Sequence, residues 1–137
     1  MKPNKSFGAF QYSIVFLPCC DLEAMRTFYN GVLGLPVALD QGQCLIFRVG
    51  TTQALGYFGF CADLQPELTR LAKVFLTLVV ATREEVDFWH KELTERGVVC
   101  TKSPSYLSQF HIYNATFQDP MSYTLEIQTF DVNYAPH

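Results

Sequence analysis

The sequence predicts an α+β fold made of two similar β-α-β-β-β units, with the helices packed outside a curved sheet. Each half of the chain starts with an apolar, β-branched run, continues through a segment with helical spacing, and ends in short runs divided by turn residues. In the first strand and the helix cap, equivalent residues of the two halves are 61 positions apart, as for Ile14 and Phe75. In the last two strands they are 70 positions apart, as for Gly56 and Glu126. Such constant spacing is what a duplicated unit predicts.

The first unit is expected within residues 11–62. Asp21 is a favourable N-cap, and Gly34 followed by Pro36 is a typical helix end. The expected elements are a strand at 12–17, a helix at 22–33, and strands at 37–39, 43–49 and 53–60.

The second unit is expected within residues 73–130. Thr82 and Glu85 have the spacing of a capping box, and Gly97 ends the helix that follows. Because Ser103-Pro104-Ser105 is polar and turn-forming, residues 102–109 are expected to form a loop. The expected strands lie at 73–80, 98–101, 110–117 and 122–130.

Length and composition fit one domain. The chain has 137 residues, of which 49% are hydrophobic and 17% are charged, and this balance provides one core and argues against disorder. We therefore expect a single domain at 11–130, with module one at 11–62, a linker at 63–72, module two at 73–130 and an N-terminal arm at 1–10.

Charge and hydropathy argue against two kinds of partner. The net charge is -3, and lysine and arginine form no cluster, so no nucleic-acid partner is expected. No apolar run reaches the roughly 18 residues that a membrane span needs. The remaining expectation is a small-molecule partner, because 12 Phe and 7 Tyr suit an aromatic core or an aromatic-lined cavity.

The cysteines are expected to be free thiols. There are 5 of them, an odd number without repeated spacing, which is a poor disulfide framework. The adjacent pair Cys19-Cys20 does not match a zinc-type pair either. A reduced, cytoplasmic protein with cysteines that fill core space is the expected result.

Two motifs resemble the glyoxalase, bleomycin-resistance and dioxygenase superfamily, which has the vicinal-oxygen-chelate fold. The first is D-L-E-A…F-Y…V-L-G-L at 21–35, and the second is F-Q-D-P…Y-T-L-E-I at 117–127. Met25 and Ser122 depart from the family pattern, which often has Ser and Gly there. The resemblance covers roughly residues 11–130, and it implies paired βαβββ modules whose mixed sheet curls around a cleft, with the helices outside. It also implies a homodimer.

In metal-dependent members, four ligands come from the first and last strands of each module. The resemblance puts these positions at Ile14, Gly56, Phe75 and Glu126. Only Glu126 has a donor side chain, and a catalytic divalent metal needs about three protein ligands. No metal or other cofactor is therefore assigned, although a divalent metal held by Glu126 and a substitute such as His111 is an alternative. His90 is expected on the second helix, outside the sheet.

Alternation along the strands predicts an aromatic cleft with one carboxylate. The residues expected to line this cleft are Ile14, Phe16, Gly56, Phe58, Phe75, Thr77, Thr124 and Glu126. The alternative is that the two half-sheets close on each other and that the aromatic side chains form core.

Three functions follow from these alternatives. The first is a protein with a degenerate metal site that binds a small apolar or aromatic molecule. The second is a lyase, isomerase or dioxygenase that uses a metal on substitute ligands, or Glu126 as acid or base, with His111 as a further catalytic candidate. A glyoxalase I activity in particular needs ligands that this chain lacks. The third is a structural or regulatory dimer with a filled cleft.

Overall fold

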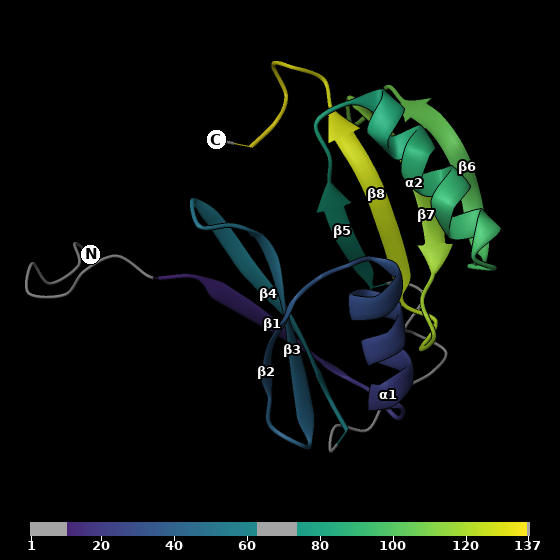
Figure 1. The fold of residues 1–137 in the computed structure, drawn as a ribbon. Coiled ribbons are helices and arrows are strands. Elements are labelled where there is room, and N and C mark those ends of the chain that lie inside the picture. The colour runs from purple at the N-terminus through teal and green to yellow at the C-terminus, as the bar shows by residue number, and fades with distance from the viewer. Residues whose placement is uncertain (1–10, 63–73, 137) are drawn as a thin grey trace, which may run out of the picture.

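The computed structural model describes residues 11–62 and 74–136, which form two four-stranded sheets (Figure 1). The first has the order β1-β4-β3-β2 and the second has the order β5-β8-β7-β6. In the first, the strands are β1 (Ser13–Pro18), β2 (Val37–Asp40), β3 (Cys44–Thr51) and β4 (Ala54–Cys61). In the second, they are β5 (Phe75–Val79), β6 (Cys100–Leu107), β7 (Ile112–Gln118) and β8 (Thr124–Phe130). The predicted α+β class with two βαβββ modules is confirmed.

A helix covers one face of the first sheet. It begins as α1 (Leu22–Met25) and continues as a π-helix, η1 (Arg26–Val32). Asp21 caps it by accepting a hydrogen bond from the Ala24 amide at 3.0 Å, as predicted. Tyr29 packs on the sheet, with its ring centroid 5.1 Å from that of Phe60 and 5.6 Å from that of Phe47.

A second helix, α2 (Arg83–Glu95), covers the outer face of the second sheet (Figure 1). The predicted capping box is present, since the Glu85 amide donates to Thr82 and the Glu85 carboxylate accepts from the Thr82 amide. Val86 and Leu93 are buried on the sheet-facing side of α2. No helix in the described parts of the chain is long and apolar enough to cross a membrane.

One prediction for the second unit is wrong. Residues 102–109 were expected to form a loop, but β6 runs on to Leu107 and pairs with β7. Pro104 is tolerated because β6 is an edge strand and its register with β7 shifts between Lys102 and Ser105. The consequence is that Lys102 stands on a strand of the sheet instead of in a solvated loop. The expected arm at 1–10 and the expected linker at 63–72 lie outside the described residues.

A buried carboxylate joins the two modules. Asp119, in the turn between β7 and β8, accepts hydrogen bonds from the amides of Met121 (2.8 Å) and Tyr123 (2.9 Å) through Oδ1. Its Oδ2 accepts from the Tyr29 hydroxyl of η1 at 2.8 Å. Tyr123 makes the reciprocal link, because its hydroxyl donates to the carbonyl oxygen of Pro18 at the end of β1 at 2.6 Å. The module-two turn is therefore fixed to both the helix and the first strand of module one.

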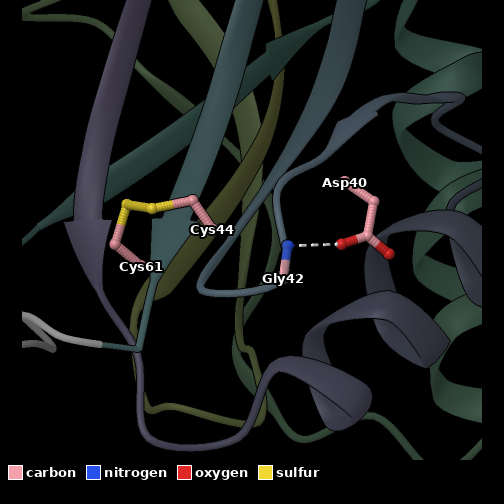
Figure 2. Close-up of a disulfide and its surroundings, with 4 residues drawn as sticks. All are labelled: Asp40, Gly42, Cys44 and Cys61. Atoms are coloured by element: carbon pink, nitrogen blue, oxygen red, sulfur yellow. Dashed lines mark hydrogen bonds between the residues drawn. A yellow bond between two sulfur atoms is a disulfide. The ribbon is translucent and has the colours of Figure 1, made fainter.

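The expectation that all cysteines are free is wrong for one pair. Cys44 and Cys61 are cross-strand partners in β3 and β4 and form a disulfide (Figure 2). Beside it, the Asp40 carboxylate accepts a hydrogen bond from the Gly42 amide at 2.9 Å and holds the turn before β3. Cys19, Cys20 and Cys100 are free. Sequence spacing could not reveal the bridge, because only the register of the hairpin brings these two residues together.

We expect the disulfide to add about 3 kcal/mol to the free energy of unfolding, since it closes a loop across a sequence separation of 17. In urea titrations, a phosphine reductant should lower the unfolding midpoint of the wild-type protein. The same reductant should not affect the Cys44→Ala/Cys61→Ala variant, and Cys100→Ala should respond as the wild type does. Equal midpoints with and without reductant in the wild type would show that the thiols are not bridged.

Burial raises the pKa of Asp119 to about 6, from an ordinary value of 3.8, although its hydrogen bonds from Tyr29 and the turn amides lower it. The folded state therefore binds the proton more tightly than the unfolded state. This contribution to stability is complete below pH 3.8 and is lost as the pH rises through about 6.

Asp119→Asn should remove this pH dependence while keeping an oxygen for the two turn amides. Between pH 7 and pH 5, the wild-type protein should gain about 1 kcal/mol of unfolding free energy relative to the variant. Urea titrations of both proteins at several pH values measure the difference. A wild-type protein that loses stability relative to the variant on acidification would contradict this assignment.

Candidate functional site

The face of the second sheet opposite α2 carries a cavity of about 540 Å³. Its apolar lining comes from Phe75, Leu107, Phe110, Ile112 and Phe130. Its polar lining comes from Lys102, Asn114, Thr116, Glu126 and Gln128. An apolar cavity with a few placed polar groups is the usual form of a small-molecule site.

The polar groups form a connected network. Glu126 accepts hydrogen bonds from the Thr77 hydroxyl at 2.7 Å and from the Asn114 amide nitrogen at 2.6 Å, one on each carboxylate oxygen. The Asn114 side-chain oxygen accepts in turn from the Lys102 ammonium at 2.5 Å. Lys102 also donates to the Ser105 hydroxyl at 2.6 Å. The carboxylate and the ammonium are thus held on either side of a single amide.

Strand alternation places this network. On β8, Leu125 and Ile127 are buried in the core, so Glu126 and its neighbours at i±2 point to the other face. Glu126 pairs with Thr77 of parallel β5 and with Thr116 of antiparallel β7. Glu126 is 8% exposed, so its charge is compensated within the protein.

The pKa of Lys102 depends on both its burial and the nearby carboxylate of Glu126. Burial lowers the pKa of Lys102, and the negative charge of Glu126 opposes this by raising it. Sequence reasoning missed Lys102 because it assigned the residue to a loop. Asn114 was missed as well, although its position two residues from Thr116 on β7 puts both on the same face.

The module-two residues that the sequence predicted share one face of the second sheet, but only two of the four line the cavity. Phe75 and Glu126 line the cavity, and Thr77 binds Glu126. Thr124 pairs with Phe75 and shares the face of Glu126.

The module-one residues divide between the two faces of their sheet. Ile14 and Phe16 pair with Tyr57 and Gly59, so they share the face that the helix does not cover. Phe58 lies on the helix-covered face instead, with its ring centroid 6.2 Å from that of Tyr29, and Gly56, two residues before it, shares that face. Gly56 and Phe58 therefore do not belong with Ile14 and Phe16.

The reason is the register between the modules. Phe16 pairs with Gly59 as Thr77 pairs with Glu126, so the residue equivalent to Glu126 is Gly59, 67 positions before it, and not Gly56. The predicted spacing of 70 holds for β3 and β7, where Ile46 and Thr116 are equivalent, but is wrong for β4 and β8. Gly59 follows Ile46 by 13 positions, whereas Glu126 follows Thr116 by only 10, because the β7–β8 ladder is shorter than the β3–β4 ladder. A shift by an odd number of residues moves a side chain to the other face of a sheet.

Phe16 occupies the place above Gly59. A Cβ atom at residue 59 would lie 2.7 Å from a ring carbon of Phe16, whereas a Cβ atom at Gly56 would meet no atom within 4 Å. The module-one counterpart of the Glu126 position is therefore covered by an aromatic ring.

The two histidines that were considered as site residues lie elsewhere. His111 has a positive φ of 55° in the connection before β7, and its ring stacks on that of Tyr134 with centroids 3.7 Å apart. It does not line the cavity. His90 is half-buried on α2, with its ring centroid 6.2 Å from that of Phe117.

The donors around Glu126 do not fit a divalent metal. Its direct partners are the hydroxyl of Thr77 and the amide of Asn114, and the next group is the ammonium of Lys102. Within residues 11–62 and 74–136, no group of three His, Cys, Asp or Glu side chains is placed to hold an ion. A hydroxyl, an amide nitrogen and a cation beside one carboxylate are poor surroundings for Zn²⁺, Ni²⁺ or Fe²⁺.

A comparison with protein families decides the assignment. The family model described as Glyoxalase/Bleomycin resistance protein/Dioxygenase superfamily matches residues 11–127. The chain belongs to this superfamily. A search of curated protein sequences found no match to this superfamily member.

Solved structures show the same fold. A glyoxalase/bleomycin resistance protein/dioxygenase from Nocardioides has a TM-score of 0.69 at 15% identity, covering 96% of this chain and 90% of its own. A family enzyme from Burkholderia phytofirmans PsJN has a TM-score of 0.67 at 24% identity, covering 86% and 97%. A glyoxalase/dioxygenase from Nostoc punctiforme has a TM-score of 0.67 at 18% identity, covering 86% and 89%. At these identities the likeness concerns the fold.

In this superfamily member, the two glycines of β4 should respond differently to alanine. Gly59→Ala should lower the unfolding free energy by about 1 kcal/mol, because the new methyl group displaces the Phe16 ring. Gly56→Ala meets open space and should be neutral or stabilise by up to about 1 kcal/mol, since alanine restricts the unfolded chain. Urea titrations of both variants provide the comparison, and equal effects would contradict the register described here.

Proposed function

We propose that this protein binds a small apolar or aromatic molecule in the cavity of the second sheet. The observation that carries the proposal is the arrangement of aromatic and aliphatic side chains around a floor of polar residues, in which Glu126 and its partners are linked by hydrogen bonds. This floor consists of Lys102, Asn114, Thr116, Glu126 and Gln128. A filled core would bring no carboxylate, ammonium and amide together on an uncovered sheet face. The cavity volume of about 540 Å³ lies within the range of sites for small organic ligands.

Enzymatic use of Glu126 has less support. Both oxygens of this carboxylate accept hydrogen bonds from side chains of the protein, Thr77 and Asn114, which hold it in a fixed position. His111 does not line the cavity, so it cannot act on the same bound molecule. A binding protein accounts for these contacts better than a lyase, isomerase or dioxygenase.

The proposal includes a homodimer. β1 and β5 are edge strands, and both carry exposed apolar side chains, among them Phe16 (47%) and Phe75 (55%). Unpaired strand edges with apolar side chains are normally covered. Light scattering on the full chain should give a mass of twice 15.6 kDa, and a mass of 15.6 kDa would contradict the dimer.

The proposal also places the protein in the cytoplasm. Disulfides are rare there, and those that occur are often redox-sensitive. Acid trapping of thiols in intact cells, followed by mass spectrometry of the Cys44 and Cys61 peptides, would show whether this bridge exists in that compartment. Retention of the protein in an osmotically released or secreted fraction would contradict the location.

Nile red, a neutral aromatic dye without N–H groups, tests the binding function. Phe110→Ala and Phe75→Ala should each weaken dye binding about fivefold, because each removes part of the apolar wall. Phe88→Ala is the matched control, since Phe88 is 54% exposed on α2, compared with 58% for Phe110. Fluorescence titration gives the dissociation constants. No saturable binding, or equal loss in the Phe88 variant, would contradict the proposal.

A further inference from the structure

The floor of the cavity holds one polar side chain without a partner. Gln128 is 7% exposed and lines the cavity. Its side-chain amide makes no hydrogen bond with any residue in the described parts of the chain. No described side-chain nitrogen or oxygen that is sealed from solvent lacks a partner, so the amide atoms of Gln128 must reach the cavity space. A nearly buried, unpaired amide costs free energy unless something else completes its hydrogen bonds.

The cationic side of the floor is already engaged. The Lys102 ammonium has three protons, and it donates to the Ser105 hydroxyl (2.6 Å), the Asn114 side-chain oxygen (2.5 Å) and the Asn114 carbonyl oxygen (3.3 Å). A ligand anion would therefore have to displace one of these contacts.

The anionic side of the floor has acceptor capacity left. A carboxylate offers about four lone-pair sites, and Glu126 uses two of them for Thr77 and Asn114. Glu126 and Gln128 are two residues apart on one face of β8, so their side chains start roughly 7 Å apart. The free hydrogen-bonding groups that face a ligand are thus carboxylate acceptors and one complete amide.

We propose that the cavity binds an aromatic ring with an N–H-bearing substituent, an amidine, amine or carboxamide, and disfavours the corresponding carboxylate. An N–H group of the ligand donates to Glu126 or to the Gln128 side-chain oxygen, and the Gln128 N–H groups meet any acceptor of the ligand. The aromatic rings of Phe75, Phe110 and Phe130 contact the ligand ring and favour a cationic substituent. This assignment of a ligand class rests on the binding function proposed above.

Three molecules of the same shape test the class. Benzamidine, benzamide and benzoate are planar, similar in size, and differ in charge and in N–H groups. Isothermal titration calorimetry on the full chain should rank them benzamidine, benzamide, benzoate, with at least about tenfold between the first and the last. Benzoate binding as tightly as benzamidine would overturn the proposal.

Gln128→Leu separates recognition from a structural role. The variant should bind benzamide and benzamidine about three- to tenfold more weakly, which is the loss expected for one hydrogen bond. Its ligand-free melting temperature should be unchanged or higher, because an unpaired amide is replaced by an apolar group of similar size. A structural role predicts a lower melting temperature instead. Gln118→Leu is the control, since Gln118 is half-buried on β7 and does not line this cavity.

The outcomes distinguish the two proposals. Nile red binding that is weakened by Phe75→Ala and Phe110→Ala, with no preference among the three benzene derivatives, would overturn the ligand class and leave the binding function intact. Absence of Nile red binding and of benzamidine binding would overturn both. Benzamidine binding that persists unchanged in Gln128→Leu would overturn the role of Gln128 even if the ranking holds.

Discussion

The placement of the site depends on the buried carboxylate of Asp119. Its Oδ1 accepts hydrogen bonds from the amides of Met121 and Tyr123, which fixes the turn that begins β8, and its Oδ2 accepts one from the Tyr29 hydroxyl of module one. Because Asp119 is 5% exposed, these contacts compensate a charge that would otherwise be costly to bury. The start of β8 determines which of its residues face the cavity. The same group therefore couples the packing of the two modules to the direction in which Glu126 and Gln128 point.

Register has a second consequence, in module one. The β3–β4 hairpin has a short turn and a disulfide at its open end, so its strands are closely fixed. The β7–β8 connection is longer because it contains the Asp119 turn, with Ser122 at a positive φ of 72°. The β7–β8 ladder nevertheless ends one pair beyond Phe117–Leu125, whereas the β3–β4 ladder continues four pairs beyond Phe47–Phe58. The early position of the Asp119 turn therefore makes module two three residues shorter between equivalent positions of its last two strands, and this breaks the repeat.

Much of the fold could be predicted from the sequence, and the reasons are local. Asp21, Thr82 and Glu85 cap helices through contacts within a few residues, and strand alternation identified Thr77, Thr124 and Glu126 as one face. What failed depends on pairing between distant segments. Pro104 reads as a loop residue unless β6 is known to be an edge strand, and Cys44 meets Cys61 only through the hairpin register. Gly56 was placed on the wrong face for the same reason. Because Lys102 was assigned to a loop, the polar floor of the cavity could not be predicted.

The two modules differ at the equivalent positions 59 and 126 of their last strands. In module two the residue is Glu126, bound by Thr77; in module one the equivalent pair is Gly59, covered by Phe16. A carboxylate at 59 would collide with the Phe16 ring, and a Phe at 77 would remove one of the two donors to Glu126. Each pair is self-consistent, and a single substitution that imitates the other module breaks it. The uncovered face of the second sheet therefore presents a carboxylate bound by a hydroxyl, whereas the equivalent position of the first sheet lies under an aromatic ring. The described residues that line the cavity accordingly all come from module two.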